Sequence, residues 1–256
     1  GLAPWMSRLP GGLIHVNVVG CALFAAISGS SAATVATVGK MSIPELRKRN
    51  YPEKLLLGSL AGSGTLGLLI PPSIILIIYG VTVQESIAKL FIAGIIPGIM
   101  IAIFFMLYVI GWSILNKNIM PKVEETFSLS QKIKQSGQLI PVIVLIASVI
   151  GSIYVGIATA TEAAALGVVG ALILSFFQKS LNKETFKLSL LGATKTSCMI
   201  AFILAGSAFL SLAMGFTGLP RNLAIWINEM SLSPYVLILV LTLFYIILGM
   251  FLDGIS

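Results

Sequence analysis

The sequence is poor in the side chains that bind transition metals. Its 256 residues include one histidine, His15, and two cysteines, Cys21 and Cys198. One histidine cannot build a histidine-rich metal centre, and the two cysteines lie in separate apolar stretches without the close spacing of a zinc or haem motif. The sequence therefore argues against such centres. Both cysteines are expected to pack as small hydrophobic side chains.

Charged residues are scarce as well. They account for 10% of the chain, whereas hydrophobic residues account for 57% and the mean hydropathy is +1.03. Soluble domains contain about 25% charged and about 45–50% apolar residues. The net charge of +7 would suggest a nucleic-acid partner if the basic residues formed one face, but they lie between long apolar runs. The composition predicts an all-α polytopic membrane protein in a lipid bilayer, with no nucleic acid and no organic cofactor.

Apolar segments of about 20 residues, long enough to cross a bilayer, set the expected topology. They cover roughly residues 55–80, 90–116, 139–157, 162–178 and 190–216, and another begins near 235. The connecting loops sort by charge, because 40–54, 117–138 and 179–187 are net positive, while 81–89, 157–162 and 217–233 are neutral or negative. The positive-inside rule predicts that the first three loops are cytoplasmic.

Residues 12–39 are apolar but too short to cross the bilayer twice. A break made of Ser28, Gly29, Ser30 and Ser31 lies near their centre. We expect a re-entrant hairpin that enters from the cytoplasm and turns at this break. One complete span with small residues for helix packing is the alternative.

The serine-rich turn offers groups that bind ions. Ser30 and Ser31 are expected to cap the returning half-helix, which leaves amides and hydroxyls for a carboxylate. Ser28 and neighbouring carbonyls, including that of Gly29, are expected to contribute oxygens to a sodium site. Thr34, one turn further along the chain, either contacts the substrate or packs.

The stretch GTLGLLIPPSIILIIYG, residues 64–80, breaks the helix expected over 55–80. Each proline costs about 3 kcal/mol or more in a helix interior. Freed carbonyls exposed to lipid would cost several kcal/mol each, so the break must face protein, water or an ion. Two half-helices are expected, at about 55–66 and 72–80, with Pro72 in the first turn of the second. A proline kink without a ligand is the alternative.

The two breaks together supply the expected sodium ligands, because carbonyls at a helix C-terminus favour a cation and hydroxyls add further oxygens. These ligands are Ser28, Gly29, Ser30, Thr65, Gly67, Pro72 and Ser73. The expected substrate contacts are Ser30, Ser31, Thr34 and Asp253.

Only two acidic residues, Asp253 and Glu162, lie in apolar surroundings. A carboxylate at the bilayer centre costs roughly 2.5–3.5 kcal/mol, which favours a functional role. Asp253 lies at the expected tip of a second hairpin and is assigned to ion or substrate binding. Glu162 follows Thr159 at a helix start, where capping explains it more simply.

A weak internal similarity relates the two hairpin regions. GLAPWMSRLPGG followed by LFAAISG, ending at Gly29, resembles GLPRNLAIWI followed by LFYIILG, ending at Gly249. Five crossings separate them, which is odd, so the sequence predicts an inverted-topology repeat of the secondary-transporter type. Residues 1–256 are expected to form one transporter domain, with the second hairpin starting at 235–256. The abrupt ends suggest a fragment of a longer protein.

Five motifs, in order, resemble the large membrane subunit of the tripartite ATP-independent periplasmic (TRAP) transporters, the DctM-like family. They are SGSSAATVATVGK, GTLGLLIPPSI, LFIAGIIPGIM, ATATEAAALG and LGMFLDG. The resemblance implies an elevator-type, sodium-driven importer of organic acids, such as C4-dicarboxylates or sialic acid, in the bacterial inner membrane. It also implies two partners, a small four-helix membrane subunit and a periplasmic binding protein. The sequence departs from the family pattern at Thr34, where many members carry an acidic residue.

Two other functional classes compete with a transporter. Gly29, Ser30 and Ser31 resemble the nucleophile turn of an intramembrane protease, but His15 lies about 13–15 residues before the serines, and a serine nucleophile needs a base within reach. We therefore do not expect an enzyme. A membrane channel, or an ion-coupled carrier that works without a binding protein, is the remaining alternative.

Overall fold

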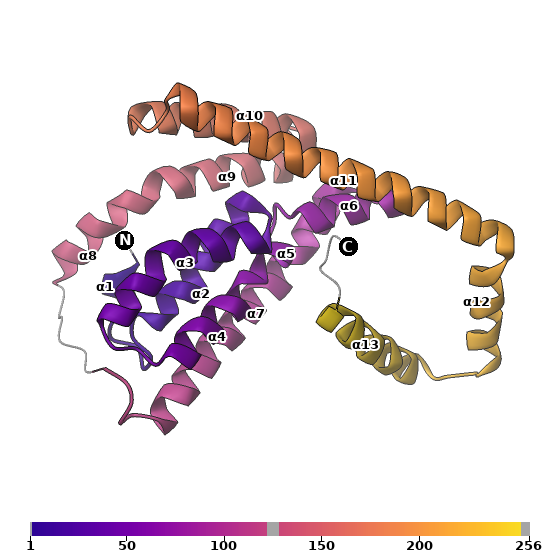
Figure 1. Ribbon diagram of the computed structural model, residues 1–256, viewed down its shortest axis with the longest axis horizontal. Coiled ribbons are helices and arrows are strands. Elements are labelled where there is room, and N and C mark those ends of the chain that lie inside the picture. Colours follow the sequence, from indigo (N-terminus) through magenta and orange to yellow (C-terminus); the bar gives the residue numbers. More distant parts are fainter. Residues whose placement is uncertain (1, 122–127, 252–256) are drawn as a thin grey trace. The chain divides into compact units, whose positions relative to one another are not determined.

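The computed structural model describes residues 2–121 and 128–251. All regular secondary structure in these ranges is helical. The contacts divide the chain into two units, Gly1–Phe177 and Gln178–Ser256, which are described separately. The helices of unit 1 are α1 Ala3–Met6, α2 Ile14–Ser28, α3 Ser31–Lys48, α4 Glu53–Gly64, α5 Leu66–Leu69, α6 Ile74–Val83, α7 Ile87–Leu115, α8 Leu129–Ser136, the short 3₁₀ helix η1 Gly137–Leu139, α9 Ile140–Tyr154 and α10 Ala160–Phe177 (Figure 1). Unit 2 contains α11 Lys183–Thr217, α12 Leu219–Glu229 and α13 Pro234–Phe251.

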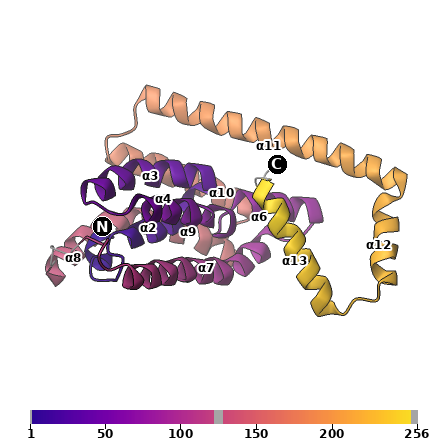
Figure 2. The ribbon, with the colours of Figure 1, turned by 60° about the horizontal axis from the view of Figure 1, so that its bottom comes forward.

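Helix α2 is the centre of unit 1, where it contacts α3, α4, α5 and α7. Figure 2 shows α2, α3, α4 and α7 side by side. Apolar side chains of α2 contribute to two core clusters, since Ile14 packs in one with Leu56 and Val109, and Cys21 packs in another with Val38 and Leu60. Cys21 is thus a buried hydrophobic side chain, as its apolar surroundings predict. The burial of α2 fixes the place where its C-terminal end lies.

Helices α2 and α3 form a helical hairpin. Gly29 ends α2 in the left-handed conformation (φ 59°), and Ser30 is extended. Helix α3 then continues through Pro44 to Lys48, so the expected loop at 40–54 is mostly helical and the connection to α4 contains only residues 49–52. An ion pair between Glu45 and Arg49 at i,i+4 extends the helix. The hydrogen bond and charge of Arg49 lower the pKa of Glu45.

The helical segment after residue 52 is interrupted twice. Helix α4 ends at Gly64, α5 provides one further turn to Leu69, and α6 starts at Ile74. The interruption at 70–73 contains both prolines. The expected position of Pro72 in the first turn of the second half-helix is wrong, because Ser73 is the N-cap and Pro72 precedes it. Pro72 lacks an N–H group, so it leaves one backbone donor fewer to be satisfied in the break.

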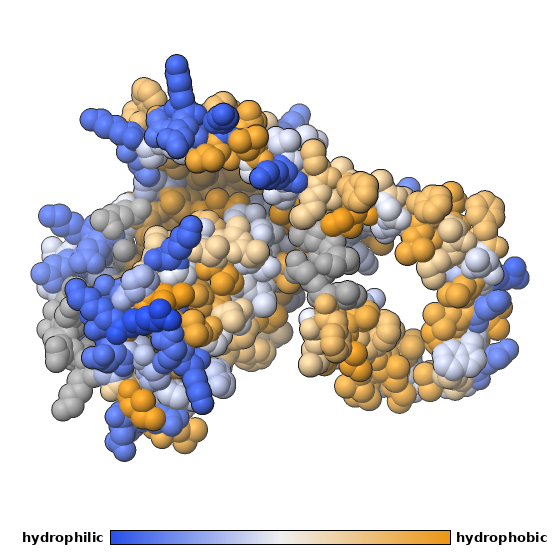
Figure 3. Space-filling view, viewed as in Figure 1, coloured by the Kyte–Doolittle hydropathy of each residue, from blue (hydrophilic) through white to orange (hydrophobic). Residues whose placement is uncertain are grey.

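The apolar helices match the expected membrane segments. Among the described residues, five helical segments are long and apolar enough to cross a bilayer, or six if the bent pair α8 and α9 is one span. The five are Glu53–Val83, Ile87–Leu115, Ala160–Phe177, Lys183–Thr217 and Pro234–Phe251. Figure 3 shows hydrophilic groups gathered around helix ends in unit 1. Length and composition therefore support a polytopic membrane protein.

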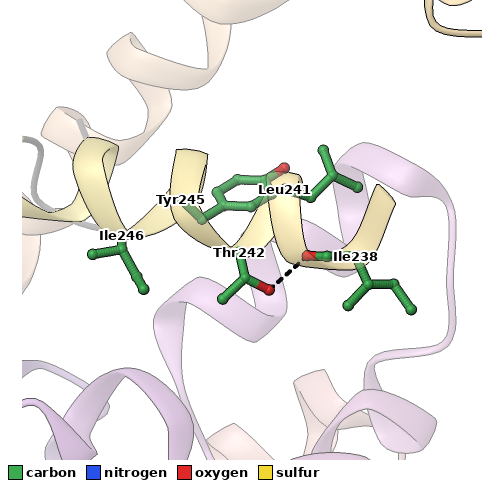
Figure 4. A pocket seen from close by; sticks show the side chains of 5 residues that line it. All are labelled: Ile238, Leu241, Thr242, Tyr245 and Ile246. Carbon is green, nitrogen blue, oxygen red and sulfur yellow. Dashed lines mark hydrogen bonds between the residues drawn. The ribbon is translucent and has the colours of Figure 1, made fainter. Parts of the chain in front are cut away.

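Unit 2 consists of apolar helices without a buried core. None of its described residues is buried, and Phe202 and Tyr245 are examples of large exposed side chains. Figure 4 shows a shallow groove on α13, lined by the Tyr245 side chain together with Ile238, Leu241, Thr242 and Ile246. The Thr242 hydroxyl donates to the Ile238 carbonyl of the same helix at 2.7 Å. The groove is lined mainly by apolar side chains, and an apolar surface of this kind suits lipid.

Candidate functional site

The turn of the α2–α3 hairpin and the 70–73 break lie against each other. The Ile74 N–H donates a hydrogen bond to the Gly29 carbonyl at 3.3 Å. A Cβ atom on Gly67 would lie 2.8 Å from the Ser30 carbonyl carbon and 2.8 Å from the Ser31 nitrogen. The chain therefore brings together two breaks that are separated by about forty residues, and glycine at 67 permits their close approach.

Hydrogen bonds from hydroxyl groups connect the two sides of the hairpin turn. The Ser28 and Thr34 hydroxyl oxygens are 3.0 Å apart, and the Thr34 hydroxyl donates to the Ser30 carbonyl at 2.7 Å. Thr34 is fully buried in this arrangement. The structure gives Thr34 a packing and hydrogen-bonding role, and its contact with a substrate stays a prediction.

The two serines after Gly29 have different positions. Ser30 is the N-cap of α3, and its hydroxyl accepts a hydrogen bond from the Ala33 N–H at 3.4 Å. Ser31 is the first helical residue, so the expected capping by Ser31 is wrong. Only one residue can occupy the N-cap, because the cap needs extended backbone angles that Ser30 has and a helical residue lacks. Both serines are partly exposed.

In the second break, Ser73 is buried and the Pro72 carbonyl faces the hairpin turn, whereas Thr65 is exposed. The buried Ser73 hydroxyl donates to the Leu68 carbonyl at 2.6 Å, which bridges the non-helical residues. The Pro72 carbonyl faces Gly29, since a Cβ on Gly29 would lie 2.9 Å from its oxygen. Thr65 is exposed and donates to the Gly62 carbonyl of its own helix at 2.7 Å. Asp253 lies outside the described residues.

The hairpin turn at 28–31 and the break at 70–73 are together called the joined breaks. The oxygens that they present belong to neutral hydroxyl and carbonyl groups. These are hard ligands, which suit an alkali or alkaline-earth cation better than a transition metal. No cluster of three His, Cys, Asp or Glu side chains that could hold a metal occurs within residues 2–121 and 128–251. The donor set of Ser28, Ser30 and the adjacent carbonyls therefore fits Na⁺ in its chemistry.

An apolar cavity of about 360 Å³ borders the site. Ile27 and Pro72 line it on the side of the two breaks, and residues of α6, α7, α9 and α10 also contribute to its lining. Its described lining contains no charged side chain. The negative charge of a solute beside this cavity would therefore have to be stabilised by backbone amides and hydroxyl groups.

Asn17 is a buried polar residue that sequence reasoning missed. Its amide nitrogen donates to the Ser59 hydroxyl at 3.1 Å and approaches the Leu56 carbonyl at 3.4 Å. The Ser63 hydroxyl contacts the Asn17 carbonyl at 3.5 Å. This network joins α2 to α4, and the available signal was one asparagine inside the apolar run GLIHVNVVG.

Replacement of Asn17 by alanine is expected to lower the free energy of unfolding by about 1–3 kcal/mol, because buried partners on α4 lose their donor. Asn116→Ala is the matched control, since the hydrogen bond that the described residues give its amide goes to the Trp112 carbonyl of the preceding helix turn, at 2.9 Å. Chemical denaturation in detergent measures both. Equal losses of unfolding free energy in the two variants would show that the hydrogen bonds between α2 and α4 add nothing to stability.

Glu162 and His15 have structural roles. The Thr159 N–H and hydroxyl both donate to the Glu162 carboxylate at 2.8 Å, and the Glu162 N–H donates to the Thr159 hydroxyl at 3.3 Å. This is a capping box, which confirms the prediction for Glu162. The ring of His15 is buried, with Nε2 at 2.8 Å from the Pro10 carbonyl.

Comparisons with known proteins identify the family. Residues 3–256 match the family model described as "Tripartite ATP-independent periplasmic transporter, DctM component". The C4-dicarboxylate TRAP transporter large permease of Pseudomonas aeruginosa is 33% identical over 251 residues, which cover 97% of this chain and 58% of that protein. The corresponding permease of Rhodobacter capsulatus is 34% identical over 258 residues, with 95% and 58% covered.

A relative with a different solute name is similarly close. The 2,3-diketo-L-gulonate TRAP transporter large permease of Escherichia coli is 32% identical over 248 residues, which cover 95% of this chain and 57% of that protein. The chain thus spans somewhat more than half the length of these relatives. These relatives are transporter permeases rather than enzymes. The family model, the relatives and the apolar helices agree that this chain belongs to the DctM family of TRAP transporter large permeases, which are integral proteins of the bacterial inner membrane.

Proposed function

We propose that this chain forms part of a sodium-coupled importer of a small organic acid, and that the joined breaks bind both the ion and the substrate. The observation that carries the proposal is the contact between the breaks, where the Ile74 N–H binds the Gly29 carbonyl and Gly67 lies against Ser30. Breaks in apolar helices are costly unless they face a polar partner. Their convergence at one place supports one shared site.

Helix ends of both signs meet at this site. The C-terminal end of α2 at Ser28 presents the partial negative charge that favours a cation. The N-terminal ends of α3, with its N-cap Ser30, and of α6, with its N-cap Ser73, present partial positive charge for a carboxylate. The arrangement supports the binding of Na⁺ and an organic anion side by side. Bound Na⁺ would supply fixed positive charge next to the substrate carboxylate.

The substrate class is proposed from the acid chemistry and from the relatives. Permeases of P. aeruginosa and R. capsulatus that resemble this chain are named for C4-dicarboxylates. A C4-dicarboxylate is therefore the first substrate to test, and a sugar acid of the sialic acid type is the second. Asp253 stays in the proposed site as an ion or substrate ligand.

The proposed transporter has two further components. In the proposed assembly, a small four-helix membrane subunit accompanies the permease and a periplasmic binding protein delivers the substrate. Transport is proposed to follow an elevator mechanism, with the α2–α3 hairpin as the first re-entrant hairpin and an inverted repeat completing the site. The long apolar helices of both units are compatible with such a membrane domain.

Reconstitution tests the coupling. The complete permease, with its small subunit and binding protein, is placed in proteoliposomes, and uptake of radiolabelled succinate is measured with Na⁺ or K⁺ outside. Saturable uptake that requires Na⁺ and the binding protein is expected. Uptake indifferent to Na⁺ would remove the coupling, and conductance without saturation would favour a channel. Uptake that needs no binding protein would favour the simpler ion-coupled carrier.

Ser30→Ala is expected to reduce uptake about tenfold or more, because it removes a hydroxyl from the joined breaks and a cap from α3. Ser86→Ala is the matched control. Ser86 also caps a helix, α7, and its hydroxyl accepts from the Lys89 N–H at the same distance of 3.4 Å. Initial uptake rates at equal protein insertion compare the two variants, and similar rates would exclude a special role for Ser30.

A further inference from the structure

A separate cleft with cationic and hydroxyl groups in its lining lies in unit 1, between the loop before α2, the α3–α4 connection and the end of α7. Its volume is about 550 Å³. We propose that this cleft binds the phosphate group of an anionic phospholipid. None of the lining residues belongs to the joined breaks, so the proposal stands apart from the proposed transport site.

Two cationic side chains, Arg8 and Lys117, line the cleft. Within residues 2–121 and 128–251, neither has a carboxylate within ion-pair distance, since the ion pairs there are Arg47 with Glu53 and Arg49 with Glu45. The described lining contains no acidic side chain. The positive charges of Arg8 and Lys117 favour an anion in the cleft.

Ser113 supplies a buried hydroxyl that has no partner. The residue is 3% exposed, lines the cleft, and its oxygen makes no hydrogen bond within the described part of the chain. Buried hydroxyls are normally hydrogen-bonded, so an unpartnered one beside a cleft indicates a missing ligand. A phosphate oxygen would accept a hydrogen bond from the Ser113 hydroxyl.

Tyr51 and the glycine loop complete the cleft. The Leu13 N–H donates to the Tyr51 hydroxyl oxygen at 3.0 Å, and burial raises the pKa of Tyr51, so its phenol keeps a proton to donate. Gly11 has a φ of +102°, and a Cβ there would lie 2.6 Å from Val109 and 3.1 Å from the Ser113 hydroxyl oxygen. Glycine at position 11 therefore leaves space beside the Ser113 hydroxyl that a side chain would fill.

The position of the cleft favours a lipid over a soluble anion. Lys117 follows two residues after the candidate span Ile87–Leu115, and the other lining segments also lie at ends of apolar helices. This is the end that the basic 40–54 stretch predicts to be cytoplasmic, where anionic lipids concentrate. Basic pockets between helices at this depth suit lipid headgroups.

The outer surface of α7 offers a path for an acyl chain. Ile114, on the rim of the cleft, is 50% exposed. Leu107 and Phe104 are 54% and 57% exposed and lie on the same helix face, because they precede Ile114 by seven and ten residues. Gly111 lies between them, with open space where its side chain would be. If the lipid headgroup occupies the cleft, its acyl chains can therefore lie along these exposed apolar side chains of α7.

Native mass spectrometry of the complete, detergent-purified permease tests the proposal. The probes are dioleoyl-phosphatidylglycerol, which is anionic, and dioleoyl-phosphatidylcholine, which has the same chains but no net charge. Tighter binding of phosphatidylglycerol by about tenfold or more is expected. The double variant R8Q/K117Q should lose about tenfold in affinity for that lipid, and S113A about threefold.

The control K40Q/K48Q removes the same charge from exposed lysines of α3 outside the cleft, and its affinity should stay within about twofold of the wild type. If both double variants lost the same affinity for phosphatidylglycerol, the effect would depend only on net charge, and the proposed site would be wrong. Equal binding of the two lipids would overturn the site as well. Binding of inorganic phosphate or succinate as tight as that of the lipid, with the same dependence on Arg8 and Lys117, would assign the cleft to a soluble anion instead. Because Ser113→Ala leaves both charges in place, its loss of affinity distinguishes a built site from surface attraction.

Discussion

Gly67→Ala is expected to abolish most substrate uptake and to destabilise the protein. Its new methyl group would lie under 3 Å from three backbone atoms, the Ser30 carbonyl carbon and oxygen and the Ser31 nitrogen. Backbone cannot yield as a flexible side chain can, so the hairpin turn and α5 must separate. Overpacking of this kind costs about 1–3 kcal/mol. Because the separation displaces the oxygens of both breaks, uptake should fall on the order of a hundredfold, since small misplacements of a site have effects of that size.

The control for Gly67 is Gly58→Ala. Gly58 lies in α4 with nothing within 4 Å of its hypothetical Cβ. Alanine in an exposed helix is favoured over glycine by roughly 0.5–1 kcal/mol, so this variant should be neutral or slightly more stable. Thermal unfolding and uptake, measured at equal insertion, compare the two. If Gly67→Ala behaves like Gly58→Ala, the two breaks do not meet as described.

Gly29→Ala is expected to have the second largest effect, for two separable reasons. Gly29 has a φ of +59°, where alanine costs roughly 1–2 kcal/mol. Its Cβ would also lie 2.9 Å from the Pro72 carbonyl oxygen and 3.3 Å from the Ile74 nitrogen. The contact should strain the hydrogen bond from the Ile74 N–H to the Gly29 carbonyl. We expect lower stability together with weaker apparent affinity for Na⁺.

Gly156→Ala separates the two causes. Gly156 has a φ of +76°, but nothing lies within 4 Å of its Cβ position. This variant should show the backbone cost alone, with normal Na⁺ dependence. The difference between the two variants then measures the contact with the second break. Identical unfolding temperatures and Na⁺ dependence would show that the contact has no energetic consequence.

Local features of the fold could be predicted from local sequence. The apolar runs predicted the long helices, and Thr159 with Glu162 predicted the capping box, because these depend on residues within one or two turns. The predicted end of the hairpin at residue 39 was less accurate. Helix α3 continues to Lys48, since the pairing of Glu45 with Arg49 supports helix in a stretch whose charges suggested a loop.

The composition of the site was partly predictable. The glycines, serines and prolines marked both breaks, because these residues interrupt helices by known local effects. The orientation of each side chain was not predictable. Thr65 is exposed and Thr34 is buried, although both had been assigned to binding, and Asn17 was overlooked because its partners lie about forty residues away on α4.

The sequence by itself determined that this protein is a helical membrane protein of the DctM family and where its helices break. Those properties follow from hydrophobic length, local backbone preference and motif order. Only the tertiary structure decided that the two breaks touch, that Gly67 and Gly29 are the contact points, and that a basic cleft forms beside Ser113. Such contacts depend on how α2, α4, α5 and α7 pack, and packing is a property of side chains distant in sequence.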